Sequence, residues 1–170
     1  MYEKLLTRRS IRKYQPRQVT DAELDAVLEA GLYAPTGKNN QKPVMVAVRD
    51  KETRDQLSRM NAAVMGVDSD PFYSAPCVIV VLADPEFPTW RDDGSLVMGN
   101  LMNAAHALGL GSCWINRARE EFDSEEGKQL LKSLGVTGDY EGIGHCILGW
   151  AKDPAPAAKP RKADWVYWVE

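Results

Sequence analysis

The sequence PCVIVVLA at residues 76–83 is long enough for a strand and contains no charged side chain. A continuous apolar run of this length is typical of a strand that is covered on both faces. Residues 142–150, GIGHCILGW, predict a second strand flanked by glycines. Shorter apolar runs predict two more strands, at residues 43–48 and 112–115.

Helical patterns occupy the intervals between these strands. Thr20 and Glu23 have the spacing of a capping box, which predicts a helix from residue 21 to about residue 33. Later in the chain a longer helix is expected, with either Asp93 or Ser95 as its N-cap. The same reasoning predicts helices around Tyr2–Leu6, at 51–64 and at 124–134.

The order of these elements points to an α+β fold. Strands and helices alternate, but the connections differ too much in length for a doubly wound sheet with regular crossovers. We therefore predict one domain over residues 1–170, built as a three-layer sandwich. Its tail, 152–170, has three prolines between Lys152 and Arg161 and is expected to run extended, with a last strand at 165–169. The tail aromatics Trp165, Tyr167 and Trp168 must then pack on the core or on a second copy.

Composition excludes several classes of protein. The hydrophobic share is 44% and the charged share 26%, with no apolar run near the roughly 20 residues of a membrane span, so we expect no membrane protein. The opening MYEKLLTRRSIRKY lacks the apolar segment of a secretory signal, and a cytoplasmic location is expected. The three cysteines, Cys77, Cys113 and Cys146, lie in apolar stretches and are expected to be buried thiols.

Positive charge is concentrated at the two ends. The net charge is −3, yet residues 1–20 carry six basic side chains and one acidic one, and residues 152–170 carry four and three. A sequence pI near 5.5 argues against binding to a nucleic-acid backbone. A small basic cluster can still bind one phosphate-bearing ligand, and a solvated basic end segment is the alternative.

The common catalytic motifs are missing. There is no G-x-S-x-G elbow and no phosphate loop, and Gly109-Leu110-Gly111 lacks the third glycine of a dinucleotide fingerprint. The two histidines, His106 and His145, supply neither a convincing triad nor a metal site. We expect no metal and no catalytic acid, base or nucleophile, so any chemistry would come from a bound cofactor.

Four motifs, taken in order, resemble the FMN-dependent nitroreductase superfamily. They are Arg8–Arg12 (RRSIR), Pro35–Gln41 (PTGKNNQ), Gly109–Ile115 (GLGSCWI), and Gly149-Trp150 followed by Lys159-Pro160-Arg161. The resemblance runs from about Lys4 to Val169. It implies an α+β sandwich in an intertwined homodimer, with the tail exchanged between subunits and two FMN molecules bound in clefts at the interface.

The resemblance also implies which residues bind FMN. Arg8 would bind the phosphate with Arg9 beside it, and Ser10 would touch the ribityl chain. Lys159 and Arg161 would close on the same phosphate. This agrees with the charges, because a phosphate is best held by a bidentate guanidinium and further cations. Arg12 would place a cation near the flavin pyrimidine edge, and a solvated arginine is the alternative.

Two further segments complete the implied site. The partner subunit would place Pro35, Thr36, Gly37 and Asn39 against the flavin, and the Gln41 amide would bond a polar edge. Ser112 and Trp114 would lie on the strand that passes the ring, although an ordinary core strand is the alternative. The chain departs from the family pattern at Lys42, inserted before Pro43, and at Asn116 and Arg117, where relatives often carry Glu-Gly.

From this resemblance we expect an FMN oxidoreductase that takes hydride from NADH or NADPH onto flavin N5. It would pass electrons to a small planar acceptor, nitroaromatic or quinone-like, by ping-pong kinetics. A flavin or enone reductase on the same scaffold, and a flavin-binding module without turnover, are the alternatives. No ribose-reading motif distinguishes NADH from NADPH.

Overall fold

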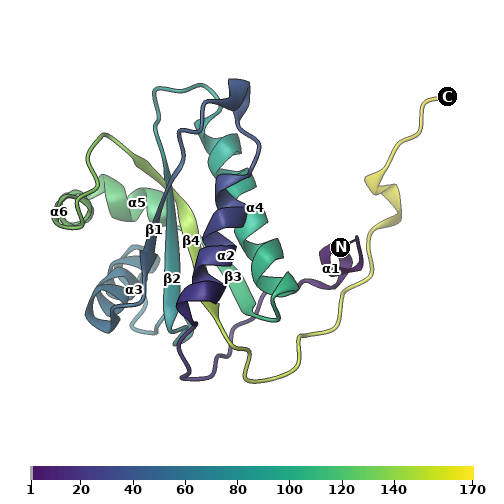
Figure 1. Ribbon diagram of the computed structural model, residues 1–170, viewed down its shortest axis with the longest axis horizontal. Coiled ribbons are helices and arrows are strands. Elements are labelled where there is room, and N and C mark those ends of the chain that lie inside the picture. Colours follow the sequence, from purple (N-terminus) through teal and green to yellow (C-terminus); the bar gives the residue numbers. More distant parts are fainter. Residues whose placement is uncertain (1) are drawn as a thin grey trace.

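The computed structural model describes residues 2–170 and is built around a four-stranded antiparallel sheet (Figure 1). The strand order is β1-β2-β4-β3, with β1 at Val44–Val48, β2 at Cys77–Ala83, β3 at Gly111–Ile115 and β4 at Glu141–Gly149. The four predicted strands are therefore confirmed. All seven residues of β2 are buried, as its uniformly apolar sequence requires.

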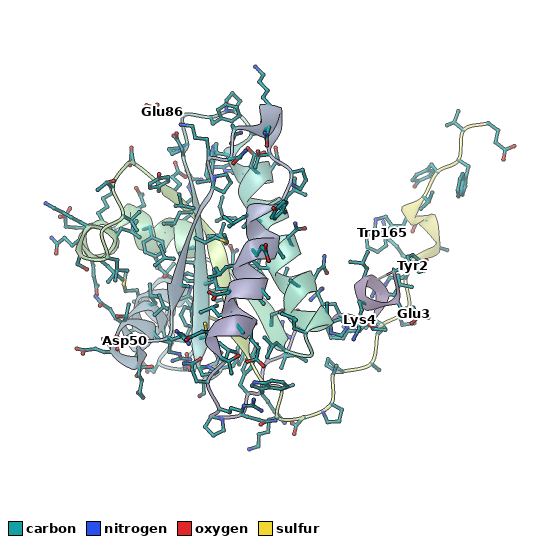
Figure 2. The ribbon with its side chains drawn as sticks, in the orientation of Figure 1. Tyr2, Glu3, Lys4, Asp50, Glu86 and Trp165 are labelled. Carbon is teal, nitrogen blue, oxygen red and sulfur yellow. The ribbon has the colours of Figure 1, made fainter. Side chains whose placement is uncertain are left out.

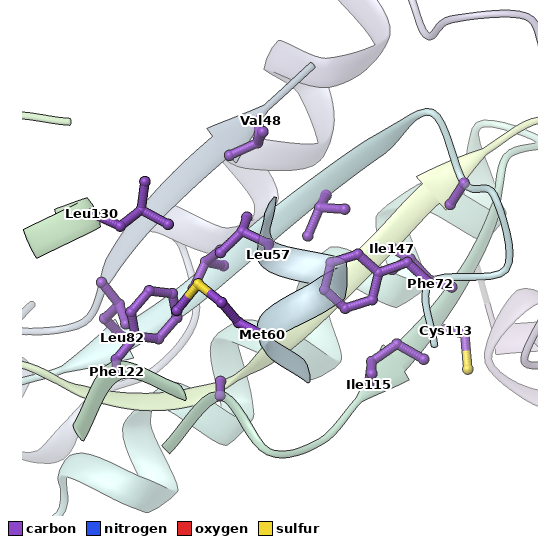
Figure 3. Close-up of a cluster of buried hydrophobic side chains, with 14 of the residues drawn as sticks. Val48, Leu57, Met60, Phe72, Leu82, Cys113, Ile115, Phe122, Leu130 and Ile147 are labelled. Atoms are coloured by element: carbon purple, nitrogen blue, oxygen red, sulfur yellow. The ribbon is translucent and has the colours of Figure 1, made fainter. Parts of the chain in front are cut away.

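Helices cover both faces of the sheet and form the predicted three layers. Val78, Val80 and Leu82 of β2 face one cluster of buried side chains, together with residues of α3 (Lys51–Met65), α5 (Ala118–Asp123) and α6 (Glu125–Ser133). Figure 3 shows Leu57, Met60 and Phe122 of this cluster packed over the sheet. The alternate β2 residues face α2 (Asp21–Leu32) and α4 (Trp90–Ala107).

Local hydrogen bonds begin α2 and α3 where the sequence predicted, whereas α5 was not predicted. The capping box of α2 is present, since the Glu23 N–H donates to Thr20 Oγ1 over 3.3 Å and the Thr20 N–H donates to Glu23 Oε2 over 2.8 Å. Asp50 caps α3 by accepting from the Thr53 N–H (Figure 2).

The prediction that Asp93 or Ser95 caps α4 is wrong. The helix begins one turn earlier, at Trp90, with Thr89 as its N-cap residue. Asp93 is therefore inside the first turn, where its buried carboxylate accepts hydrogen bonds from another segment. Its preference for an N-cap is overridden by that tertiary role.

The two ends of the chain leave the body of the fold on the same side (Figure 1). The predicted N-terminal helix is present as α1, Tyr2–Thr7. The predicted strand at 165–169 is absent: this stretch holds a short 3₁₀ turn at Ala163–Trp165 and then extended chain. A strand needs a neighbour for its backbone hydrogen bonds, and the tail lies along none. Trp165, labelled in Figure 2, is 63% exposed. Trp168 is 84% exposed, so packing of these side chains on the chain's own core is also excluded.

The cysteines and the helix lengths complete the description. Cys77, Cys113 and Cys146 are free and buried, as predicted, and burial raises the pKa of the Cys77 thiol to about 12. Within residues 2–170, no helix combines the length and the apolar character needed to cross a bilayer.

Candidate functional site

The outer edge of β3 is only partly covered. The Ile11 N–H donates to the Ser112 carbonyl over 3.0 Å, and Ser10 bridges Ser112 in parallel. The N-terminal segment then turns away, since Tyr14 bridges Ala151 beyond the end of β4. Because backbone groups alternate along an antiparallel strand, Trp114 directs its N–H and C=O to the same outer edge as Ser112. Past Ser112, this edge offers a donor and an acceptor to a ligand.

Two arginines lie at the start of this edge. We call the group formed by Arg8, Arg9 and Ser112 the cradle. Arg8 and Arg9 are half-buried and Ser112 is 2% exposed. Among the residues that the structure describes, Arg8 Nη1, Arg9 Nε and Ser112 Oγ are buried without a hydrogen-bond partner. Buried donors of this kind are costly when left unpaired. Their placement therefore suits an anionic ligand that accepts hydrogen bonds.

The cradle lies against the last turn of α4. Thr7 Oγ1 lies 2.9 Å from His106 Nε2, which joins the end of α1 to that turn. Burial lowers the pKa of His106, and the positive charges of Lys4, Arg8 and Arg9 lower it further. The positively charged form of His106 is therefore disfavoured, because the surrounding cations make this end of the site electropositive.

Arg12 and the beginning of the tail lie beside the cradle. The Arg12 side chain is exposed, with its guanidinium carbon 5.9 Å from the centre of the Tyr73 ring. Residues Ser10–Lys13 line a hollow of about 220 Å³ together with Asp153, Pro154 and Pro156. Lys13 Nζ lies 2.9 Å from Asp153 Oδ2, so the tail starts next to Ser10.

The tail cations do not join the cradle within one copy of the chain. Lys159 and Arg161 are exposed, and no hydrogen bond or ion pair between described residues connects them to Arg8. The tail carries them away from the body after Pro156 (Figure 1).

The Pro35–Gln41 loop is built on one buried carboxylate. Asp93 is 2% exposed and accepts from the Gly37 N–H over 2.8 Å, from Asn40 Nδ2 over 2.7 Å and from Thr89 Oγ1 over 2.9 Å. Burial disfavours the charged form, but these hydrogen bonds outweigh it and hold the pKa of Asp93 below its usual range. The carboxylate is therefore ionised and fixes the loop to α4.

The conformation of the loop requires such an anchor. Lys38, Asn39 and Gln41 all have φ between 53° and 54°, a region that is uncommon for residues other than glycine. Within the loop, Thr36 Oγ1 accepts from the Gln41 N–H over 3.1 Å. Pro35, Thr36, Asn39 and Gln41 line a groove of about 630 Å³, which gives this face room for a flat ligand.

The cradle and the loop lie at opposite ends of α4 (Figure 1). The loop is bound to Asp93 and the end of α1 to His106, thirteen residues further along the helix. At 1.5 Å of rise per residue this is about 20 Å. One copy of the chain therefore brings Arg8, Ser10 and Ser112 together, and separately Pro35, Thr36, Gly37, Asn39 and Gln41.

Trp114 faces the open edge with its backbone groups rather than with its ring. The indole packs on the α4 face and lines a hollow of about 250 Å³ with Trp90, Asn116 and Ile143. Sequence reasoning missed Asp93 as the anchor of the loop. The sequence offered Asp93 only as a helix cap, because the residues that it contacts in the loop lie more than fifty positions earlier in the chain.

Comparisons with known proteins show what the chain is similar to. The model of the Nitroreductase family matches residues 5–150. A protein of Archaeoglobus fulgidus with the provisional name NADH dehydrogenase/NAD(P)H nitroreductase is 34% identical over 154 residues, which are 88% of this chain and 84% of that protein. The FMN reductase [NAD(P)H] of Bacillus subtilis is 26% identical over 174 residues, covering 92% and 68%. A crystal structure of a nitroreductase with bound FMN from Bacteroides fragilis superposes with a TM-score of 0.91 at 30% identity, covering 99% and 98%.

The first prediction concerns Asp93→Asn. The amide would turn a donor toward Asn40 Nδ2, so we expect a loss of about 1–3 kcal/mol in the free energy of unfolding and faster amide exchange over residues 37–41. In the wild type, the lowered pKa of Asp93 means that its contribution is present above about pH 4 and is lost on acidification through the lowered value. The variant should lack this part of the pH dependence. Urea unfolding at several pH values, with amide exchange, measures both.

Asp92→Asn is the matched control, because Asp92 is the adjacent acid on α4 and is exposed. If both variants lose the same stability and leave the exchange of residues 37–41 unchanged, Asp93 is not the anchor of the loop.

Proposed function

The chain belongs to the nitroreductase family, and we propose that it acts as a homodimer whose two sites are each assembled from two copies of the chain. Its class is that of an FMN-dependent NAD(P)H oxidoreductase. The acceptor we propose is a small planar molecule, nitroaromatic or quinone-like, reduced in a ping-pong cycle. One domain, residues 1–170, would supply all the parts, with residues 152–170 exchanged between copies.

The observation that carries this proposal is the group of unpaired buried donors in the cradle. Arg8 Nη1, Arg9 Nε and Ser112 Oγ fit the phosphate and the polar chain of FMN, because charge-assisted bonds to a guanidinium suit a phosphate. Ser10 lies beside Ser112, in position for the ribityl chain. The open edge at Trp114 would then accept the polar rim of the flavin ring.

The separation along α4 supports a site shared between copies. The loop with Pro35, Thr36, Gly37, Asn39 and Gln41 is about 20 Å from the cradle along the helix, too far to close on the same ring. A second copy placed antiparallel would bring its loop to the first copy's cradle. The tail of the second copy would also cross to the first copy, and its Lys159 and Arg161 would reach the phosphate of the FMN bound there.

Exposed apolar side chains favour the same assembly. Large side chains on α1, at the end of α2 and in the tail are left in solvent, and a single copy rarely exposes so many. They are Tyr2, Leu5, Leu6, Leu32, Tyr33, Trp165, Tyr167 and Trp168. Contact with a second copy would cover them.

The chain's own residues bind and orient the reactants. Bound FMN supplies the redox chemistry, accepting hydride from NADH or NADPH at N5 and delivering electrons to the acceptor. Arg12 would place a positive charge near the ring, where it stabilises negative charge on the reduced form. In the proposed dimer the loop of one copy and the strand edge of the other would enclose one groove, which donor and acceptor would occupy in turn.

The function itself is tested by anaerobic titration. We expect the purified protein to carry FMN, NADH or NADPH to bleach its visible absorbance, and a nitroarene or a quinone to restore it. Release of FAD on denaturation would contradict the cofactor. Bleaching followed by recovery with free flavin or an enone alone would favour the reductase alternative, and FMN that is not bleached would favour a binding module.

Arg8→Ala tests the cradle. Loss of charge-assisted hydrogen bonds to the phosphate should cost about 1.5–3 kcal/mol, which is about 10- to 150-fold in the Kd for FMN. Excess FMN should restore most of the turnover, because the reacting ring lies away from the phosphate. Fluorescence titration measures the Kd. The control Arg17→Ala removes a charge from the same segment, where the guanidinium lies over Trp150, and should leave the Kd unchanged. Equal Kd values for all three proteins would show that Arg8 is assigned to the wrong part of the ligand.

Mixed dimers test whether the site is shared. Arg8→Ala damages the cradle and Asp93→Ala the loop, so a dimer with one copy of each should keep one intact site and one doubly damaged site. Co-expression with two different tags isolates this dimer. We expect one FMN site of wild-type affinity per mixed dimer, and no site of wild-type affinity in either parent. If each site belonged to a single copy, the mixed dimer would have no wild-type site.

A further inference from the structure

A cluster of buried polar side chains lies on the face of the sheet that carries α3 and α5. It consists of Asn61 in α3, Glu121 in α5 and His145 in β4, which are 0%, 1% and 0% exposed. Glu121 Oε2 lies 3.0 Å from His145 Nε2, and the His145 ring lies between Phe72 and Phe122, with centroids 5.0 Å and 6.1 Å away. Polar and charged side chains such as these are seldom fully buried unless they are paired or hydrogen-bonded.

Asn61 connects this cluster to the segment that follows β3. Its Nδ2 donates to the Asn116 carbonyl over 2.8 Å and to Glu121 Oε1, and its Oδ1 accepts from Arg117 Nε over 3.1 Å. Each amide atom therefore faces a group of the correct type, and the reversed amide would face none. Glu121 Oε1 fixes which way the Asn61 amide points, and the other oxygen of this carboxylate lies beside His145.

Arg117 has a backbone conformation that explains why a clamp is needed. Its φ is 75° and its ψ is 6°, in the left-handed region that glycine adopts freely and an arginine does not. Such a residue persists only where its surroundings hold it. The side-chain amide of Asn61 contacts both residues of the turn. It donates a hydrogen bond to the Asn116 carbonyl and accepts one from the Arg117 side chain.

The clamped turn continues the open edge of β3. Ile115, the last residue of β3, is paired with His145, and Asn116 and Arg117 follow directly. The same edge begins with Ser112 in the cradle and passes Trp114, whose backbone faces outward. The turn therefore lies at the end of the edge that is opposite the cradle.

We propose that Asn61, oriented by Glu121, is a positioning residue that fixes the Asn116–Arg117 turn against the ring of the cofactor. This inference rests on the proposed function, because the cradle end of the edge is taken to bind the phosphate. The buried cluster never touches the ring. It acts by holding an arginine in a conformation that a glycine would adopt without support.

The test compares Asn61→Leu with Ser58→Ala. Ser58 lies on α3 one turn earlier, is 5% exposed, and donates a 2.6 Å hydrogen bond to Asp70, so its loss costs a similar buried contact without touching the turn. For Asn61→Leu we expect amide exchange at residues 116–118 to rise about tenfold beyond that of the control. Flavin reduction at saturating FMN should slow about 10- to 100-fold, with the Kd for FMN within about threefold of wild type.

A second substitution separates clamping from general damage. Adding Arg117→Gly to Asn61→Leu should restore most of the reduction rate, because glycine needs no clamp. If Asn61→Leu does not fold, Arg117→Ala and Arg117→Gly replace it. Both lose the Arg117 side of the clamp, but alanine keeps the backbone strain and glycine does not, so only alanine should show the defect.

The outcomes separate this inference from the proposed function. Exchange and reduction rates in Asn61→Leu equal to those in Ser58→Ala, or equal rates in the alanine and glycine variants, overturn the inference and leave the proposed function intact. A wild-type protein that binds no FMN overturns the proposed function and this inference with it, even if Asn61→Leu frees the turn.

Discussion

The backbone of an edge strand needs hydrogen-bond partners, and the way β3 meets this requirement organises the molecule. The N-terminal segment covers the edge at Ser112 and then turns toward Ala151. The rest of the edge, through Trp114, stays open. Unpaired edges invite unwanted strand pairing unless something covers them. In the proposed assembly a flat cofactor covers this one, which explains why the basic cradle and the edge occur together.

Two buried carboxylates have parallel structural roles on opposite faces of the sheet. Asp93 in α4 holds the Gly37 loop, and Glu121 in α5 holds Asn61 and, through it, the turn at Arg117. Each loop contains non-glycine residues with positive φ, which a backbone adopts only under constraint. Two of the segments that would face a ligand, the Gly37 loop and the turn at Arg117, are thus strained, and each is held by a buried carboxylate.

Properties that depend on local sequence could be predicted, and those that depend on distant partners could not. The strand at residues 76–83 follows from its composition, and α2 begins where Thr20 and Glu23 indicate. Asp93 has the composition of a helix cap but serves a loop more than fifty residues earlier in the chain, which no local pattern encodes. The tail aromatics suggested a strand, although a strand requires a neighbour that one copy does not provide. The family motifs located the cradle and the loop as candidates, but the strained Arg117 became visible only through its φ angle.

The helix α4 has a contact at each end that bears on the site, the loop at Asp93 and the end of α1 at His106. The helix therefore sets the distance between these two contacts as well as forming part of a layer of the core. One residue inserted between these two positions would rotate one end by about 100° against the other and lengthen the helix by about 1.5 Å. The number of residues in this segment is therefore constrained, because it sets the rotation of one end of the helix relative to the other. Natural variation in it should come in whole turns or be confined to its ends, even where no side chain in the middle touches a ligand.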